Sequence, residues 1–531
     1  MDLTYSYLLQ TFRQFTWTSA FLSAAALFIG SIVAVREIFK PLHYKKPIKG
    51  KRWKLPPGPA GVPLFGNVLQ FQRARRDEVD FTKYLSSLAS FGEMATLHMG
   101  SKTWVLLNSN RVVDELISKR GSVTHERPYM PVALGLVSRG NRFFLQETKR
   151  WADARRVLHH LLTGSAVKSC GQLQELESVQ LLAAYLHRPR EWYSHHYRYS
   201  VSLMHQIILG ERLLKSTGEL DHLRGIIGGF IQCINGNMID FFPQLDALPK
   251  VLQPWRKRYE RMGQIHWEGF RTWWEPLKQS VAEGTAMPSL ARDVLLCKDT
   301  KYPGGDDDAM YLAMSTISAG SDNPRMAMNV FVMAALSYPE PFGKARAEVD
   351  RVCGHDANRL PDVDDMTSLP YLCALVKEVI RWRPSVPMIP QHQSIQDLEF
   401  EGYLFPAGTE FVINGVAAGQ DFPDAESFSP ERWLDGENES KVSHGLWHFG
   451  GGRRICVGYK IAQTELFLAF SRLIYCFDFA AAGPYDNLRL RHYHAGEPFP
   501  VEMKVRNPDH EQLINNQAER FGVLESAKAK F

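Results

Sequence analysis

Paired cysteines are missing from this chain of 531 residues. Its seven cysteines, at positions 170, 233, 297, 353, 373, 456 and 476, form no CxxC pair and follow no framework spacing. This pattern argues against a disulfide-stapled secreted scaffold and against a zinc cage, and it favours a reducing compartment. A low-complexity linker is missing too, and the hydrophobic fraction of 45% is ordinary. One large domain behind a short N-terminal extension fits these features best.

Positive charge is scarce outside one N-terminal cluster. Residues 36–54 hold eight Lys or Arg against the single acid Glu37, a balance of +7, so the rest of the chain sums to about −2 from a total of +5. The main body is therefore not basic, which removes the electrostatic reason to expect nucleic-acid binding. A glycine-rich dinucleotide or flavin fingerprint is also missing, so we expect no nicotinamide- or flavin-binding domain in this chain.

An uncharged run of 21 residues, FTWTSAFLSAAALFIGSIVAV, extends from Phe15 to Val35. At helical rise it covers about 30 Å, enough to cross a hydrocarbon core. A cleaved signal peptide is the main alternative, but this run exceeds the usual apolar core of one and the basic cluster follows it. By the positive-inside rule residues 36–54 stay cytosolic and residues 1–14 cross. The run therefore predicts a single-pass anchor.

Four prolines stiffen the segment after the basic cluster, LPPGPAGVPLFGN, because proline fixes φ and prevents helix formation. We therefore expect a basic and proline-rich hinge over 36–67, one main domain over 68–506 and a charged C-terminal tail over 507–531. Alternating apolar stretches at Met94–Met99 and Trp104–Leu107 predict short strands of a small sheet.

One cysteine stands in a glycine-rich loop, FGGGRRICVG, from Phe449 to Gly458. The three consecutive glycines and Gly458 permit backbone turns closed to other residues. Such a loop brings N–H groups towards the sulfur of Cys456, and Arg453 and Arg454 add positive charge, so we expect the thiolate to be favoured. A thiolate with no second cysteine in its loop suits a haem iron better than zinc. The alternative is a small apolar cysteine beside an ordinary turn.

A long apolar helix is predicted from Asp307 to Ser337, with AGSDNP in its middle. The small residues Ala319 and Gly320 leave room for something flat or diatomic against the backbone. Pro324 lacks the N–H that the carbonyl of Gly320 needs, so we expect the helix to be interrupted and to bend there. A freed carbonyl beside the acid Asp322 can hold water.

Three further pairs or runs stand at helical or loop spacing. Trp151 and Arg155 lie four apart in KRWADARR, and Glu378 and Arg381 lie three apart in KEVIRWRP, so each pair shares a helix face. FSPERW follows at 428–433, with Arg432 inside it. After the cysteine loop, YKIAQTELFLAFSRLIYCF has the apolar rhythm of a buried helix, whose N-terminal dipole points towards the sulfur.

Taken in chain order, these features resemble the cytochrome P-450 family, the haem-thiolate monooxygenases. The loop match rests on five positions within ten: Phe449, Gly452, Arg454, Cys456 and Gly458. The resemblance implies a mainly α fold with small β-sheets and a haem b bound through Cys456. It is strongest to fungal microsomal members that tailor secondary metabolites.

The resemblance also implies roles for other residues. Trp151 and Arg155 would lie over the haem edge, and Arg155, His392, Arg453 and Arg454 would face the propionates. Glu378, Arg381 and Arg432 would form a buried network that locks the cysteine loop, since a carboxylate between two guanidiniums fixes geometry. A lid over the substrate is implied for residues 172–281, with an aromatic lining that includes Phe230, Phe241 and Phe242. Candidate substrate contacts are Val386, Met388 and Ile389.

The chain departs from the family at Asn323, where a threonine is usual. A hydroxyl both donates to dioxygen and relays protons, whereas an amide donates but relays poorly. We expect water held by Asp322 and the Gly320 carbonyl to carry protons instead. The candidate catalytic residues are Ala319, Gly320, Asp322 and Asn323.

The implied activity is oxidation of a lipophilic substrate by O₂. Hydroxylation, desaturation and oxidative rearrangement or ring expansion all stay open as outcomes. Electrons from NADPH would arrive through the FAD and FMN of an NADPH–cytochrome P-450 reductase, with cytochrome b5 as a second donor, at the endoplasmic reticulum membrane. The catalytic domain would lie on the cytosolic face. Two alternatives are a haem-thiolate isomerase or dehydratase that needs no reductase, and a non-catalytic haem sensor.

Overall fold

The computed structural model describes residues 53–161, 170–214, 218–297, 302–434, 446–492 and 496–529. The predicted anchor at 15–35 lies outside the described residues, as does most of the basic cluster. Within the described ranges, no helix combines the length and the apolar character needed to cross a bilayer.

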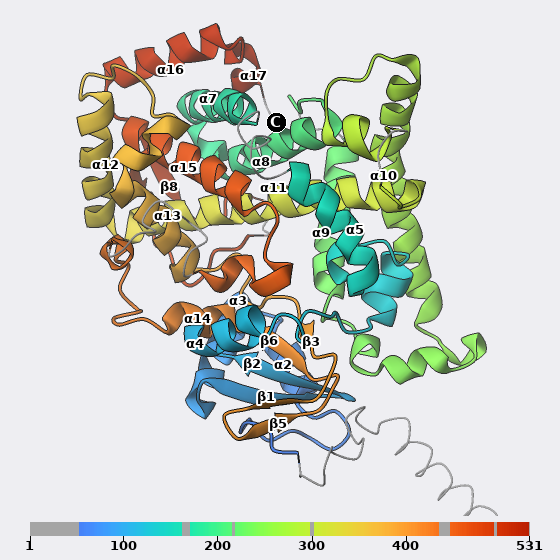
Figure 1. Ribbon diagram of the computed structural model, residues 1–531. Helices are drawn as coiled ribbons and strands as arrows, with labels where there is room; N and C mark the ends of the chain where they lie inside the picture. Colours follow the sequence, from blue (N-terminus) through green and yellow to red (C-terminus); the bar gives the residue numbers. More distant parts are fainter. Residues whose placement is uncertain are drawn as a thin grey trace, which may run out of the picture.

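Helices make up most of the described chain (Figure 1). The longest, α11 (Asp306–Ser337), runs through the middle of the helical part, with α8 (Trp192–Leu209) beside it. The other helices of this part are α5 (Thr148–Leu161), α7 (Gly171–His187), α9 (Gly218–Cys233), α10 (Arg256–Glu283), α12 (Pro339–Cys353), α13 (Pro370–Trp382) and α15 (Tyr459–Cys476). Because α11 has neighbours on nearly all sides, it is apolar all round and not amphipathic.

Three small sheets accompany the helices. The four-stranded sheet has the order β1 (Met94–Met99), β2 (Lys102–Leu107), β6 (Glu410–Ile413) and β3 (His392–Gln393). β2 pairs with β6 in parallel, and the other two pairings are antiparallel. The two hairpin-like sheets join β4 (Leu398–Phe400) to β5 (Tyr403–Phe405) and β7 (Phe477–Ala481) to β8 (Val501–Val505). Both predicted strands are thus confirmed.

Short helices cover the four-stranded sheet (Figure 1). They are α2 (Val68–Ala74), α3 (Glu78–Ser87), α4 (Asn110–Val113) and α14 (Gly415–Gln420). Aromatic rings fill the space beneath them: Phe71 meets Trp104 edge to face, and Phe241 packs against both. Phe241 and Phe242 are therefore core residues of this sheet and do not line a lid, which corrects the prediction for both.

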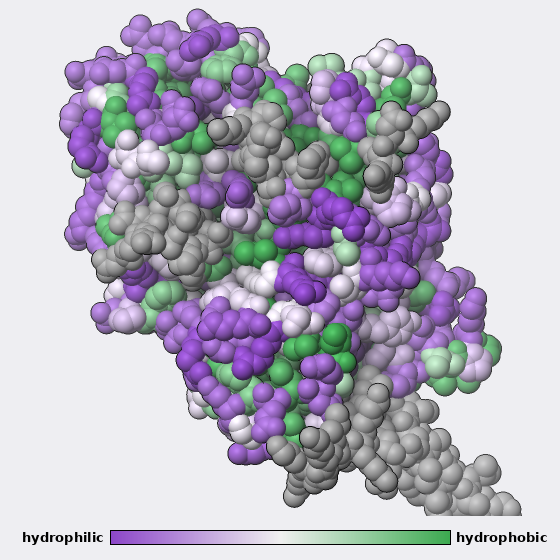
Figure 2. Space-filling view, viewed as in Figure 1, coloured by the Kyte–Doolittle hydropathy of each residue, from purple (hydrophilic) through white to green (hydrophobic). Residues whose placement is uncertain are grey.

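The C-terminal segment is not a tail. Residues 508–528 form α16 (Pro508–Arg520) and α17 (Leu524–Lys528), which pack on α7 (Figure 1). Ile514 is fully buried because α16 turns its apolar stripe inwards, and Val523 is fully buried at the start of α17. Its outer face is hydrophilic, as Figure 2 shows over α16 and α12. The domain boundary predicted at residue 506 is therefore wrong.

No disulfide joins any of the seven cysteines, all of which lie within the described residues, as their spacing predicted. Five of the seven are buried, Cys297 is half-buried, and only Cys456 is exposed. Burial raises the pKa of Cys476 and of Cys373 to about 12, which keeps both as inert thiols.

Candidate functional site

The cysteine loop is closed by its own backbone. The N–H of Cys456 donates to the carbonyl of Phe449 at 2.7 Å. Gly450 and Gly452 take φ values of +75° and +58°, and a Cβ on Gly452 would stand 2.2 Å from the carbonyl oxygen of Ile117. Both positions therefore favour glycine for conformation, and Gly452 favours it for space as well. This confirms the prediction for Gly450 and Gly452, whereas Gly451 has an extended backbone with a φ of −152°.

Gly458 has a different reason to be glycine. Its φ is −90°, which any residue adopts, and no atom lies within 4 Å of the place where its Cβ would stand. The predicted backbone turn is wrong for this residue. Its bare side instead borders open space two residues after Cys456, where a flat group lying against the sulfur would fit.

The Cys456 side chain has accessible surface although protein atoms surround it closely. Its side chain is exposed, yet burial raises the pKa of its thiol, so its accessible surface opens on a space inside the protein. The N–H of Gly458 and the charge of Arg155 act in the opposite direction and lower that pKa. Their effect is smaller, so the expectation that this loop favours thiolate by itself is wrong. A bound metal cation would deprotonate such a thiol outright.

The positive charge beside the sulfur comes from α5 and not from the loop. Arg155 donates a hydrogen bond to the carbonyl of Ile455, the residue before Cys456. Arg453 is exposed, and neither it nor Arg454 is among the groups that shift the pKa of Cys456. The prediction that the two loop arginines supply this charge is therefore wrong.

Arg454 is held by the chain that precedes α5. Its guanidinium donates to the carbonyls of His125 at 2.9 Å and Gln146 at 3.2 Å and to the Thr148 hydroxyl at 3.2 Å. It also lies 4.1 Å above the ring of Trp151. The Cζ of Arg155 lies 6.0 Å from the centre of the same ring. The WxxxR helix is bound to the cysteine loop through both arginines, while their contact with propionates stays a prediction.

His392 lies near this arginine cluster. Its Nδ1 lies 3.0 Å from the carbonyl of Thr124, so that nitrogen carries the proton. Burial, and then the charges of Arg127 and Arg454, hold its pKa well below the usual range, so the ring is neutral. Contact of His392 with a propionate stays a prediction.

α11 exposes its N-terminal turn and two residues near its middle. Ala319 and Asn323, one turn apart, are exposed, while the residues on both sides along the helix are buried. The Asn323 amide donates to the Ala319 carbonyl at 3.1 Å, and the helix continues through Pro324. The predicted interruption is therefore wrong, because the helix is continuous to Ser337. Ala319 and Asn323 therefore present accessible surface on one side of the helix.

Two neighbours of the exposed pair point into the protein. A Cβ on Gly320 would stand 2.7 Å from the sulfur of Met204 on α8, so this glycine serves helix packing and not the room for a diatomic ligand. Asp322 is buried, and its Oδ1 accepts hydrogen bonds from the guanidinium of Arg325. Sequence reasoning missed both partners, although the i, i+3 spacing of Asp322 and Arg325 could have indicated the ion pair.

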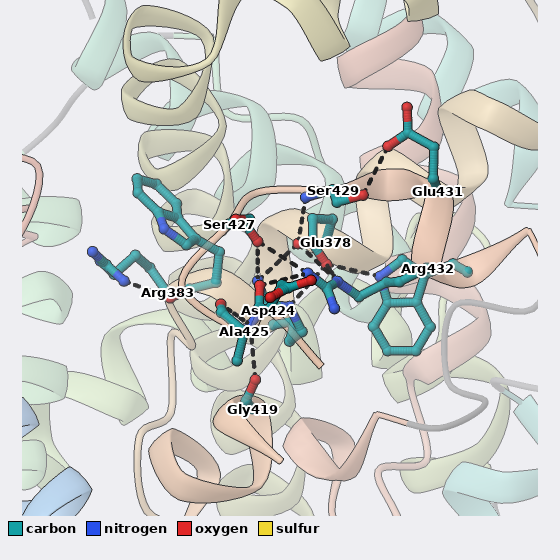
Figure 3. Close-up of polar contacts among 12 residues, drawn as sticks. Glu378, Arg383, Gly419, Asp424, Ala425, Ser427, Ser429, Glu431 and Arg432 are labelled. Atoms are coloured by element: carbon teal, nitrogen blue, oxygen red, sulfur yellow. Dashed lines mark hydrogen bonds and ion pairs between the residues drawn. The ribbon is translucent and has the colours of Figure 1, made fainter. Parts of the chain in front are cut away.

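The Glu-Arg-Arg network is present as predicted (Figure 3). Arg381 meets the Glu378 carboxylate in a fork, with Nε at 2.8 Å and Nη2 at 2.7 Å. Arg432 Nε lies 3.2 Å from the same carboxylate, and the Trp433 indole donates to it at 2.9 Å. All of these side chains except those of Arg432 and Trp433 are at least 98% buried.

The network reaches the cysteine loop through α14. Arg381 donates to the carbonyl of Gly419 at 2.8 Å, near the end of α14. At the start of the same helix, the Gly415 carbonyl lies 3.1 Å from His448 Nε2, one residue before Phe449. His448 was not predicted, and it is the link between the network and the loop.

The predicted substrate contacts differ in environment. Ile389 is buried in the core under the sheet, and Val386 packs against that same core. Met388 is half-buried and pairs through its backbone with Asn414. Phe230, predicted in the lid lining, is also buried. Contact of the first three with a substrate stays a prediction.

The described parts of the chain contain no group of three or more His, Cys, Asp and Glu side chains that could hold a metal together. The metal-binding chemistry around the accessible sulfur of Cys456 is therefore that of one thiol, with the N-terminus of α15 three residues further along the chain. A single cysteine ligand with accessible surface suits a haem iron.

Comparison with known proteins agrees with this geometry. The family described as Cytochrome P450 matches residues 56–487. The chain is 31% identical over 455 residues to cytochrome P450 monooxygenase virE of Hypocrea virens, covering 81% of this chain and 80% of that one. It is 31% identical over 490 residues to cytochrome P450 monooxygenase verL of Clonostachys rogersoniana, covering 87% and 89%.

A solved structure supports the fold. A zebra fish cytochrome P450 structure with progesterone has a TM-score of 0.65 and 24% identity, covering 80% of this chain and 99% of that one. At this identity the likeness speaks for the fold alone. The family match spans most of the chain and includes the cysteine loop, α11 and the Glu378 network. The chain therefore belongs to the cytochrome P450 family and is a P450 monooxygenase.

Proposed function

We propose that Cys456 holds the iron of a haem b and that Ala319 and Asn323 face the opposite side of that haem. The observation that carries this proposal is the accessible sulfur inside the protein, with the N–H of Gly458 and the charge of Arg155 directed at it. When bound, a haem with a cysteine thiolate ligand supplies the activation of O₂. Arg155, Arg454 and His392 would bind the propionates after exchanging part of their present contacts.

The chain's own residues would control protons on the α11 side. The Asn323 amide already donates to the Ala319 carbonyl, so it offers little to an oxygen ligand in this conformation. The Asp322 carboxylate is held by Arg325, so this ion pair has to open before Asp322 can pass a proton to water near the Gly320 carbonyl. This places proton supply under the control of Arg325.

We further propose that the substrate is a lipophilic small molecule of fungal secondary metabolism. The support is that relatives at about 30% identity are named fungal P450 monooxygenases. Hydroxylation, desaturation and oxidative rearrangement are the outcomes to be distinguished by product analysis. NADPH would act through the flavins of a separate reductase, with cytochrome b5 as a second donor, because no nucleotide-binding fingerprint is present in the sequence.

The anchor at 15–35 would hold the enzyme on the endoplasmic reticulum membrane with its catalytic domain in the cytosol. Exposed apolar residues support this orientation: Val62 and Leu64 lie in the hinge, Leu69 follows it, and Val251 is 88% exposed. Phe65, next to Leu64, contacts Phe242, which brings the segments around residues 65 and 242 together. Deletion of residues 1–35 should move the protein from the membrane to the soluble fraction in a sedimentation assay.

The carbon monoxide difference spectrum of the reduced protein tests the central proposal. A thiolate-ligated haem gives a strongly red-shifted Soret band, and Cys456→Ser should lose it. Cys297→Ser, at a half-buried cysteine away from the loop, should keep it. A folded wild-type protein without the band would falsify the proposal, and turnover that persists without NADPH and reductase would favour an isomerase.

A further inference from the structure

Arg142 is a buried charge in the loop before α5. It is 2% exposed, and its Nε donates to the Ser138 hydroxyl at a long 3.4 Å. Its terminal nitrogen Nη2 is buried and has no hydrogen-bond partner. Proteins normally pair a buried charge with a counter-charge, because the desolvation cost is otherwise uncompensated.

No acid compensates this charge in the residue ranges that the structure describes. Burial lowers the pKa of Arg142 to about 10, and the two groups that act against this shift are Tyr311 and Cys233. Burial raises the pKa of each of these to about 12, so both are neutral at pH 7. The guanidinium thus keeps its proton and lacks an anion.

Aromatic rings and two further unpartnered polar atoms surround it. Arg142 Cζ lies 3.7 Å from the ring centre of Phe230 on α9 and 5.8 Å from that of Phe270 on α10. The Phe270 ring lies 5.2 Å from that of Tyr311 on α11. The Tyr311 hydroxyl and His266 Nδ1 are buried without partners. Burial, with the charge of Arg142, lowers the pKa of His266 to about 3, so it is neutral.

We propose that Arg142 and Tyr311 bind a carboxylate carried by the lipophilic substrate, an inference that rests on the proposed function. Arg142 supplies the charge, the Tyr311 hydroxyl donates a hydrogen bond, and Phe230 and Phe270 pack on the apolar part of the acid. Cation–π contacts and the long hydrogen bond to Ser138 hold the guanidinium until the acid enters. Since all these groups are buried, the acid reaches them only when α9 and its Phe230 move aside.

The position of Tyr311 sets the length of the substrate. Tyr311 and Ala319 stand on the same helix, about 12 Å of rise apart. A molecule held by its carboxylate at Tyr311 therefore offers carbons on the order of 12 Å from that group to the exposed middle of α11. Acids much shorter than this would bind without reaching it.

Binding of dodecanoate and of its methyl ester to the full-length, haem-loaded protein tests the proposal. Equilibrium dialysis should give a Kd for dodecanoate at least tenfold below that for methyl dodecanoate. Arg142→Met should remove this preference and leave the Kd of the ester unchanged. Arg139→Met is the matched control, because Arg139 is a nearby exposed arginine that lies 4.7 Å above the Trp267 ring. It should keep the preference.

Thermal unfolding of the ligand-free protein gives a readout independent of binding. Arg142→Met should raise the Tm, because it removes an uncompensated charge and keeps an apolar side chain of similar length. A lowered Tm would show that Arg142 is already compensated and would overturn the proposal. So would equal Kd values for acid and ester in the wild type, or a preference kept by Arg142→Met.

Arg142→Lys and Tyr311→Phe give an independent test of binding. Each should weaken dodecanoate binding about threefold to tenfold, and unchanged binding by both would overturn the inference. The carbon monoxide spectrum of the same preparations separates the two hypotheses. An intact red-shifted band in a protein that binds dodecanoate no more tightly than its methyl ester would overturn only the carboxylate site. An absent band would overturn the proposed function.

Discussion

Arg325 donates two hydrogen bonds, from Nε and Nη2, to the carboxylate of Asp322 one turn away on α11. A third nitrogen of the same guanidinium donates to the carbonyl of His492. The acid that the sequence predicts as a proton source is therefore bound to Arg325. This relationship gives the first prediction.

Asp322→Asn should uncouple the enzyme, raising the hydrogen peroxide released per NADPH severalfold, because the amide cannot supply protons. Arg325→Met should change the same ratio, since it frees the carboxylate. Peroxide and NADPH are measured together in the reconstituted system with reductase. Asp307→Asn is the control and should leave the ratio unchanged. Asp307 is an exposed aspartate of α11 that accepts a hydrogen bond from Trp267 on α10. Coupling unchanged in Asp322→Asn would remove this acid from the proton route.

Gly320 should be replaceable once Met204 is shortened. Gly320→Ala gains helix propensity of about 1 kcal/mol but meets the Met204 side chain, which costs roughly 1–3 kcal/mol. We expect a small net loss in the free energy of unfolding in the wild type and a gain in the Met204→Ala background. A double-mutant cycle in denaturant measures the coupling. Additive effects would mean that Met204 is not the reason for this glycine.

The Glu378 network should be far more costly to break than a surface pair. Glu378→Gln leaves the buried Arg381 without its counter-charge, which should cost about 3–5 kcal/mol of unfolding free energy. Haem retention on gel filtration should fall as well, because α14 and His448 connect the network to the cysteine loop. The matched change Glu401→Gln, in the exposed pair with Arg111, should leave both quantities unchanged. Equal effects of the two variants would contradict a locking role.

Glu465 on α15 should make stability depend on pH. It is 1% exposed, and burial raises its pKa to about 8 from 4.5, against the smaller effect of the Ser200 hydroxyl. A carboxyl whose folded pKa is raised contributes stability that is fully present below pH 4.5 and is lost as pH rises to about 8. The loss is on the order of 4 kcal/mol.

Glu465→Gln should remove most of that slope. Urea unfolding at several pH values between 5 and 8 should show the variant gaining on the wild type as pH rises, with the largest difference near pH 8. Parallel curves for the two proteins would show that this carboxyl does not titrate in the folded core. Haem content is followed throughout, so that cofactor loss is separated from unfolding.

The C-terminal helices should contribute to the stability of the catalytic domain. Ile514→Ala deletes a fully buried side chain between α16 and α7 and should cost about 2–5 kcal/mol. The control Val251→Ala, at a residue that is 88% exposed, should have no measurable effect. The free energy of unfolding measures both. An unaffected Ile514→Ala would restore the picture of a dispensable tail.

Local sequence signals determined the parts of the site that depend on short-range chemistry. Gly450 and Gly452 follow from a loop that needs positive φ, and the strands β1 and β2 follow from period-two patterns. Glu378 and Arg381 share a helix face at a spacing of three, so their pairing is also predictable from the sequence. The ordered set of motifs identified the family.

The tertiary structure decided which partner each site residue meets. No sequence pattern shows that Met204 fills the place of a Gly320 side chain, that Arg155 and not Arg454 sits beside the sulfur, or that burial outweighs both influences on Cys456. These facts depend on contacts between residues more than 100 positions apart. Likewise, Arg142 reads as an ordinary loop arginine until the fold surrounds it with rings and leaves out an acid. Short-range spacing fixes conformation, whereas burial and counter-charge arise only when distant segments pack together.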